Sequence, residues 1–71
     1  MNLKQMEYFV AIVNEGNISA AAKSLHISQP PLSAQMKLLE DELGVVLFER
    51  GSRSIFLTEA GKVFYEKALH I

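Results

Sequence analysis

The stretch NISAAAKSLHISQPPLSAQMKLLEDELG, residues 17–44, decides the fold of this chain. It predicts two short helices joined by a tight turn, and the second helix opens with Ser28-Gln29-Pro30-Pro31. The run Ser19-Ala20-Ala21-Ala22 is small enough for close helix packing, and Leu25 and Ile27 supply apolar contacts at the turn. This pattern is typical of a helix-turn-helix, in which the second helix projects outward. A projecting helix of this kind fits the major groove of DNA.

The second helix of this motif is predicted over residues 28–43. Ser28 is the expected N-cap, and Pro30 and Pro31 are tolerated because amides in a first turn lack intrahelical partners. Gly44 is the expected stop. The buried face is predicted from an i, i+4, i+7, i+11 stripe: Leu32, Met36, Leu39 and Leu43. The opposite face carries short or polar side chains: Gln29, Ser33, Ala34 and Lys37.

Two further helices are predicted before this one. Apolar residues at helical spacing indicate an amphipathic helix over residues 3–14. Asn2 and Gln5 have the spacing of a capping box, and Gly16 is the expected stop. Ser19 is the expected cap of the next helix, which should end near residues 25–26.

A small hairpin, or wing, is predicted over residues 45–57. Its strands are the apolar runs Val45–Phe48 and Ile55–Leu57, with a Gly-Ser-Arg-Ser turn between them. Arg50 and Arg53 are expected near its tip. Thr58 is then placed to cap a last helix that starts at Glu59.

The last helix has an apolar side made of Ala60, Phe64, Ala68 and Ile71. So small a body should not cover Phe64 and Ala68 fully, so we expect a partner helix to cover them. The chain ends at residues 69–71 without a C-cap signal, which predicts that the helix continues in a longer protein.

Composition narrows the possible functions. With 71 residues and a 49% hydrophobic content, the chain can form one small domain. The absence of cysteine and the presence of only two histidines give no basis for a disulfide, a metal site or a cofactor. No triad pattern and no glycine-rich phosphate loop point to an enzyme. No apolar run is long enough to span a membrane and the N-terminus is too polar for a signal peptide, so we expect a cytoplasmic protein.

The net charge of −1 is unusual for a domain that binds DNA. The acidic residues Glu40, Asp41 and Glu42 cluster at one end of the motif's second helix, so another face can still be cationic. Modest non-specific affinity for DNA follows. The acidic balance also keeps one alternative open, a winged helix used as a protein–protein interaction module.

The predicted order of three helices, a wing and a helix is a winged helix-turn-helix of the mainly α class. Several sequence motifs then resemble one family across the whole chain: Ser28-Gln29-Pro30, Leu32-Ser33, Leu39-Glu40, Glu42-Leu43-Gly44, Leu47-Phe48-Glu49-Arg50 and Leu57-Thr58-Glu59-Ala60-Gly61. In combination they are highly specific. The chain resembles the N-terminal DNA-binding domain of the LysR-type transcriptional regulators.

The resemblance implies a bacterial regulator in which residues 1–58 bind double-stranded DNA and residues 59–71 begin a linker helix. That helix would pair with its counterpart in a homodimer, and two dimers would form a tetramer in the full-length protein. A small-molecule effector would bind only a C-terminal domain that is absent from this chain.

The resemblance also implies roles for single residues. Gln29, Pro30 and Ser33 would face base edges in the major groove, while Ser28 and Pro31 would approach the backbone or a thymine methyl group. Arg53 would enter the minor groove from the wing. Two neighbours complete the predicted DNA-binding face: Ala34, where many family members carry arginine, and Lys37, a possible phosphate contact.

Each of these residues also has a structural interpretation. Gln29 and Ser33 could be solvated polar residues of a helix, and Arg53 could be an ordinary surface arginine. Leu38, where a polar residue is usual in the family, could be an exposed apolar spot or could pack against the wing.

Overall fold

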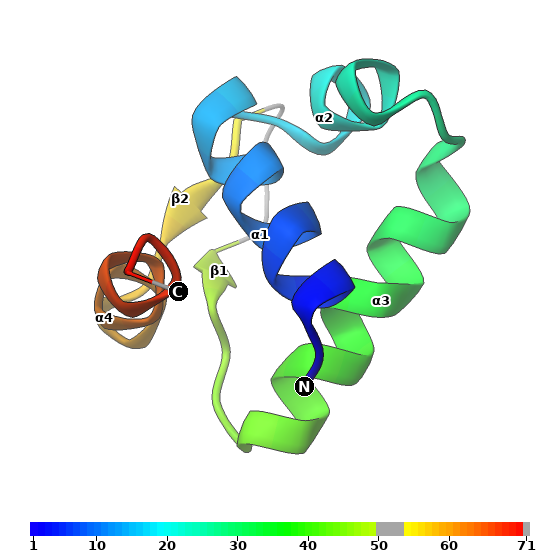
Figure 1. Ribbon diagram of the computed structural model, residues 1–71. Coiled ribbons are helices and arrows are strands. Elements are labelled where there is room, and N and C mark those ends of the chain that lie inside the picture. The colour runs from blue at the N-terminus through cyan, green and yellow to red at the C-terminus, as the bar shows by residue number, and fades with distance from the viewer. Residues whose placement is uncertain (50–53, 71) are drawn as a thin grey trace.

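The computed structural model describes residues 1–49 and 54–70. Its elements follow in the order α1 (Leu3–Glu15), α2 (Ile18–Leu25), α3 (Gln29–Leu43), β1 (Phe48–Glu49), β2 (Phe56–Leu57) and α4 (Glu59–Ala68). Figure 1 shows α1 in the middle, with α3 along one side of it and the strands and α4 on the other. This arrangement confirms the predicted winged helix-turn-helix.

Helix α1 begins and ends as the sequence predicts. The Gln5 amide donates to the Asn2 side chain at 2.8 Å, and the Asn2 amide donates back to the Gln5 side chain at 3.2 Å. This reciprocal pair is a capping box. Gly16 ends the helix with φ 83°, a left-handed conformation that glycine adopts without steric cost.

Helix α2 begins earlier than predicted, and the predicted cap Ser19 is wrong. Asn17 is the N-cap, because its extended backbone lets its side chain accept a hydrogen bond from the Ala20 amide at 2.7 Å. Ser19 therefore lies inside the first turn. The helix ends at His26, which has φ 61° and is the one described non-glycine residue with a positive φ.

Helix α3 carries the predicted buried stripe. Leu32, Met36 and Leu39 are fully buried, and Leu43, the fourth member, is partly buried. Gly44 ends the helix in the left-handed conformation. Ser28 occupies the N-cap position but its side chain makes no capping hydrogen bond. An N-cap hydroxyl accepts from the second or third amide of a helix, and here both positions are proline, which has no N–H.

The core is a cluster of large apolar side chains between α1, α3 and the segment around β1. Phe9 of α1 stands at its centre and is fully buried. Its ring lies 5.2 Å from the Phe48 ring and 5.0 Å, edge to face, from the Phe64 ring of α4. Phe64 packs against Phe9 of its own chain but stays partly buried, as expected of a side chain that so small a body does not cover fully.

Both strands of the wing begin later than predicted. Within the described residues, β1 and β2 are antiparallel and pair Phe48 with Leu57 and Glu49 with Phe56. Residues 45–47 precede the strand, because the Leu47 amide donates to the Glu40 carboxylate and the Leu47 carbonyl accepts from the Thr58 amide. The expectations for Arg50 and for residues 51–53 lie outside the described residues.

Helix α4 begins at the predicted place. The Thr58 hydroxyl accepts a hydrogen bond from the Gly61 amide at 3.0 Å, as an N-cap should. The helix does not run on to the end of the chain as expected, since it ends at Ala68 with Leu69 as C-cap. The predicted role of Ile71 lies outside the described residues.

Candidate nucleic-acid interface

The beginning of α3 projects from the body. Ser28, Gln29, Pro30 and Pro31 are all exposed, whereas the next residue, Leu32, is fully buried. The helix is thus anchored by its inner face directly after an exposed first turn. The Ser28 hydroxyl, which cannot cap the helix, is exposed at the same place.

The remaining predicted contacts continue along the same face of α3. Residues at i, i+4 and i+8 lie above one another on a helix, which aligns Gln29, Ser33 and Lys37. Lys37 is exposed and Ser33 is partly buried. Ala34 is exposed beside them, and its methyl group leaves the face shallow at this point.

Lys37 is paired within its own helix. Its ammonium lies 3.4 Å from the Asp41 carboxylate, and both side chains are largely exposed. An exposed i, i+4 pair of this kind is worth only about 0.3–0.5 kcal/mol. Lys37 can therefore exchange Asp41 for another anion at little cost.

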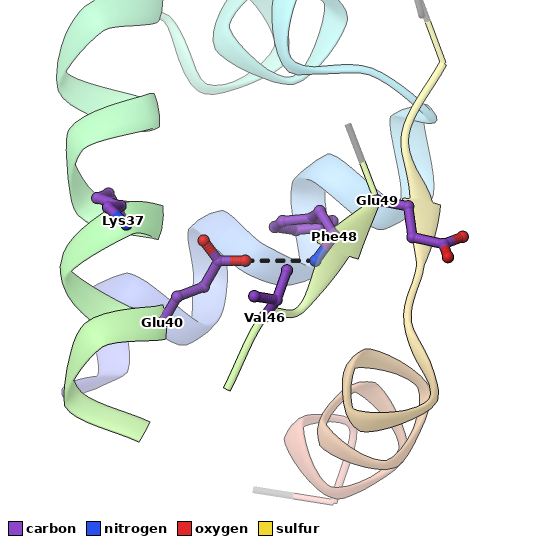
Figure 2. Close-up of a pocket in the computed structure, with 5 residues that line it drawn as sticks. All are labelled: Lys37, Glu40, Val46, Phe48 and Glu49. Atoms are coloured by element: carbon purple, nitrogen blue, oxygen red, sulfur yellow. Dashed lines mark hydrogen bonds between the residues drawn. The ribbon is translucent and has the colours of Figure 1, made fainter. Parts of the chain in front are cut away.

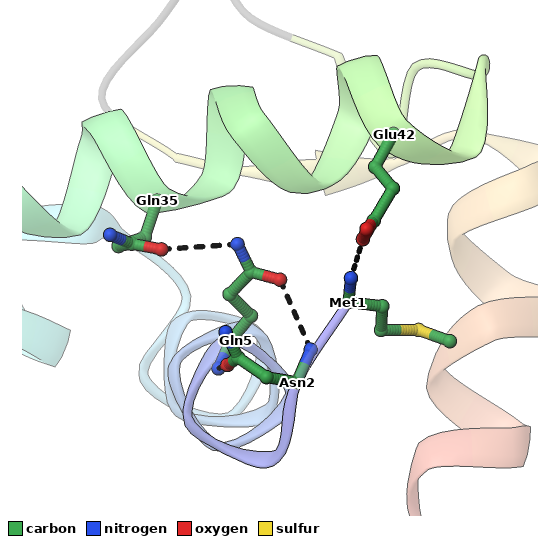
Figure 3. Close-up of polar contacts among 5 residues, drawn as sticks. All are labelled: Met1, Asn2, Gln5, Gln35 and Glu42. Carbon is green, nitrogen blue, oxygen red and sulfur yellow. Dashed lines mark hydrogen bonds and ion pairs between the residues drawn. The ribbon is translucent and has the colours of Figure 1, made fainter.

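The acidic cluster does not face the exposed first turn. Asp41 is engaged by Lys37, Glu42 forms an ion pair with the N-terminal ammonium (Figure 3), and Glu40 is buried. At 1.5 Å per residue, these residues begin about 14 Å along the axis from Pro31. The acidic cluster thus lies at the other end of α3 from the exposed first turn.

A hydrogen bond between helices α1 and α3 holds α3 in place. The Gln5 side-chain amide donates to the Gln35 side-chain oxygen at 3.0 Å (Figure 3). Gln5 is 7% exposed and also belongs to the capping box of α1. The capping role of Gln5 is visible in the sequence, but this second role is not, because two glutamines 30 positions apart give no local signal.

Leu38 is exposed. Its side chain is 54% accessible and it is absent from the apolar residues that pack on the core. It therefore stands as an apolar spot beside the polar face of α3.

The described residues offer little for other chemistry. Residues 1–49 and 54–70 contain no group of three or more histidine, cysteine or acidic side chains that could hold a metal ion. None of the helices in this part of the chain has the length and apolar character that a membrane crossing requires.

The fold and the exposed first turn of α3 define a winged helix-turn-helix domain. The model of the family described as "Bacterial regulatory helix-turn-helix protein, lysR family" matches residues 3–62. The chain belongs to this family and is its helix-turn-helix DNA-binding domain.

Curated relatives agree along the whole chain. It is 54% identical over 74 residues to the HTH-type transcriptional regulator ClcR of Pseudomonas putida and 51% identical over 72 residues to BsdA of Bacillus subtilis. All of this chain is covered in both comparisons, but only 25% of each relative. The chain spans about a quarter of the length of these relatives.

Solved structures give the same result. The chain is 53% identical to CbnR in a complex of its DNA-binding domain with DNA, with a TM-score of 0.95, covering 99% of this chain and 80% of that one. It is 48% identical to the BenM DNA-binding domain in complex with benA site 1 DNA, again with a TM-score of 0.95, covering 99% and 81%. Full-length CbnR, described as a LysR family transcriptional regulator, matches with a TM-score of 0.93 over 24% of its length.

Proposed function

We propose that this chain is the sequence-specific DNA-binding domain of a cytoplasmic bacterial transcriptional regulator, with the start of α3 in the major groove and the wing at the minor groove. In this proposal Gln29, Pro30 and Ser33 face base edges, and Ser28 and Pro31 approach the backbone or a thymine methyl group. Ala34 and Lys37 extend this surface. Arg53, which lies outside the described residues, serves as the minor-groove residue of the wing.

The observation that carries this proposal is the abrupt change from exposure to burial between Pro31 and Leu32. Four consecutive exposed residues begin a helix whose inner face is locked into the core. Such a turn can enter a groove about 12 Å wide without unfolding any part of the domain. The DNA complexes of the similar CbnR and BenM domains support the same use of this fold.

The direct test is selection of bound sequences from a random pool of DNA duplexes. We expect enrichment of one short motif, and two copies of it with partial two-fold symmetry if the protein binds as a dimer. A pool that stays random after repeated rounds would contradict sequence-specific binding.

A single substitution then tests base reading. Gln29 can form a bidentate contact with adenine through its side-chain amide. Gln29→Ala should therefore weaken binding to the selected site by about 1–3 kcal/mol and binding to random DNA much less, as measured by fluorescence anisotropy. The control is Lys23→Ala, which changes an exposed residue of α2. Equal losses on both DNAs would reduce Gln29 to a phosphate contact or a structural residue.

Salt dependence distinguishes DNA binding from the alternative, a protein–protein interaction module. The affinity of a DNA-binding domain falls linearly with salt on logarithmic axes as phosphate contacts are screened. An interaction module would show no DNA affinity to titrate. The close likeness to DNA-bound domains favours the first outcome.

The proposed assembly is a homodimer through α4, the helix that begins at residue 59. Val63 of this helix and its C-cap Leu69 are more than half exposed, and Ala60, Phe64 and Ala68 are only partly buried. We infer that the full-length regulator associates further to a tetramer and that a small-molecule effector binds elsewhere in it. The much greater length of the curated relatives supports this division of roles.

A further inference from the structure

Glu40 is a buried acidic residue on α3. It is 7% exposed, and it lies on the side of the helix that faces the segment leading into the wing. One of its carboxylate oxygens accepts a hydrogen bond from the Leu47 amide at 2.7 Å and another from the Phe48 amide at 3.3 Å. Figure 2 shows the carboxylate reaching across to the start of β1. The contact therefore links the backbone of the wing to α3 itself.

The same short segment is held from its other side by the start of α4. The Leu47 carbonyl accepts from the Thr58 amide at 3.0 Å, and the Thr58 hydroxyl donates to the Val46 carbonyl at 2.5 Å. The backbone of α4 also lies very close to the Leu47 carbonyl group. A Cβ added to Gly61 would be only 2.2 Å from the carbonyl oxygen. The Leu47 peptide groups thus join α3 to α4.

The wing has little of its own to fix its position. In the part of the wing that the structure describes, the two strands pair over two residues each, and an isolated pair of strands is marginally stable in water. Hydrogen bonds that a carboxylate accepts from backbone amides are about twice as strong as neutral ones. The Glu40 carboxylate is therefore a principal restraint on where β1 lies relative to α3.

We propose that Glu40 is a positioning residue for DNA binding. From within the recognition helix it holds residues 46–48, and through them the wing and the first turn of α4, in one orientation to the exposed start of α3. The inference rests on the proposed DNA-binding function. Glu40 itself is buried and makes no use of its charge toward the DNA.

The affinity for DNA depends on the fraction of molecules in which α3 and the wing are both correctly placed. If α3 and the wing must contact one duplex together, only molecules with both correctly placed bind tightly. The apparent dissociation constant rises in inverse proportion to the fraction of such molecules. Loss of the Glu40 carboxylate should lower this fraction while the core of α1 and α3 stays intact.

The test compares variants of this chain that lose the same negative charge from the same helix. Glu40→Met removes the acceptor and keeps the length of the side chain, and Glu40→Gln keeps one acceptor oxygen. The matched controls are Glu42→Met and Glu42→Gln, since Glu42 is half exposed and pairs only with the N-terminal ammonium in the described part of the chain. Each variant is melted first, and binding is measured at a temperature where it is fully folded.

Two readouts are expected to change together. In Glu40→Met the Leu47 and Phe48 amides should exchange with deuterium faster than in wild type, while the Leu39 amide inside α3 keeps its protection. Binding to the selected DNA site should weaken about tenfold, as for a binding-competent fraction of about one tenth. Glu40→Gln should lie between wild type and Glu40→Met, and the Glu42 variants should bind as tightly as wild type or slightly more tightly.

The outcomes separate the possible explanations. A folded Glu40→Met with wild-type affinity would overturn the proposal, whatever its amide exchange. If Glu40→Met does not fold, Glu40→Gln decides: affinity equal to that of Glu42→Gln overturns the proposal, and lower affinity with faster exchange at Leu47 supports it. If wild type itself shows no preferred site, the proposed DNA-binding function fails instead.

Discussion

At the scale of single residues, two helix caps in this domain look alike in sequence but differ in physical role. Thr58 caps α4 through its hydroxyl, which also donates to the Val46 carbonyl. Ser28 stands at the same position of α3, but the prolines that follow it offer no amide to its hydroxyl. A hydroxyl without a capping role, exposed at the start of the proposed recognition helix, is available for a ligand.

This difference predicts opposite effects of two equivalent substitutions. Thr58→Ala should lower the free energy of unfolding by about 1–2 kcal/mol because it removes a cap and a second hydrogen bond. Ser28→Ala should change stability by less than about 0.5 kcal/mol and should weaken DNA binding instead. Urea denaturation and a binding titration on both variants check this. A large loss of stability in Ser28→Ala would show that the hydroxyl supports the fold after all.

At the scale of elements, α4 is packed closely against the rest of the domain. Phe64 contacts the central ring of Phe9, and the Tyr65 hydroxyl donates to the Asn14 side chain of α1 at 2.8 Å. The Ile55 amide, just before β2, donates to the Gly16 carbonyl at 2.9 Å and so ties the wing to the end of α1. These contacts join α4 and the wing to the three-helix core. A change in the angle of α4 would therefore disturb the wing and the core as well.

The tightest point of this packing is Gly61. Gly61→Ala would place a methyl group 2.2 Å from the Leu47 carbonyl oxygen, so α4 or the wing backbone must move. We expect a net loss of about 1–3 kcal/mol in unfolding free energy, despite the gain of up to about 1 kcal/mol from the better helix propensity of alanine. Urea denaturation measures this.

The control is Lys62→Ala in the same turn of α4, where the side chain is exposed and makes one weak contact with Glu59 at 3.4 Å. Its effect should stay within about 0.5 kcal/mol. If Gly61→Ala proved as stable as this control, the approach of α4 to the wing would be looser than the structure indicates.

At the scale of the whole molecule, the proposed dimer is best tested at a residue of α4 that does not belong to the core. Phe64 is part of the core cluster, so Phe64→Glu would disturb folding as well as any dimer. Val63 is 57% exposed on α4 beside an apolar groove that Leu43, Val45 and Ala60 help to line. It is therefore the cleaner residue for the test.

Val63→Glu should shift the protein from dimer to monomer in analytical ultracentrifugation, because a carboxylate would have to be buried without a partner. Lys62→Glu is the control, since it also introduces a carboxylate into α4, at an exposed position. The melting temperature of the monomeric form should hardly change for either variant. A wild-type chain that remains monomeric at about millimolar concentration would contradict the proposed interface. At that concentration only dimers with a binding free energy of about −4 kcal/mol or weaker go undetected.

The sequence by itself determined the order of the elements and most of their ends, because these depend on neighbouring residues. The capping box of Asn2 and Gln5, the stops at Gly16 and Gly44 and the buried stripe of α3 are all local patterns. Ser28 was predicted as an N-cap, and the absence of its capping hydrogen bond was not predicted, although two prolines in succession remove the amides that this bond needs. The choice of Asn17 over Ser19 was ambiguous, because both residue types cap helices well.

Only the tertiary structure decided which distant residues meet. Glu40 was predicted as one of three similar acidic residues, and its burial depends on the path of residues 46–48 beneath it. Phe64 was expected to be covered only in part by its own chain, and the residue that supplies this cover is Phe9, 55 positions earlier in the sequence. Periodicity reports which face of a helix is apolar, but it carries no information on what covers that face. That depends on the geometry of the whole fold, in which α4 turns back onto α1.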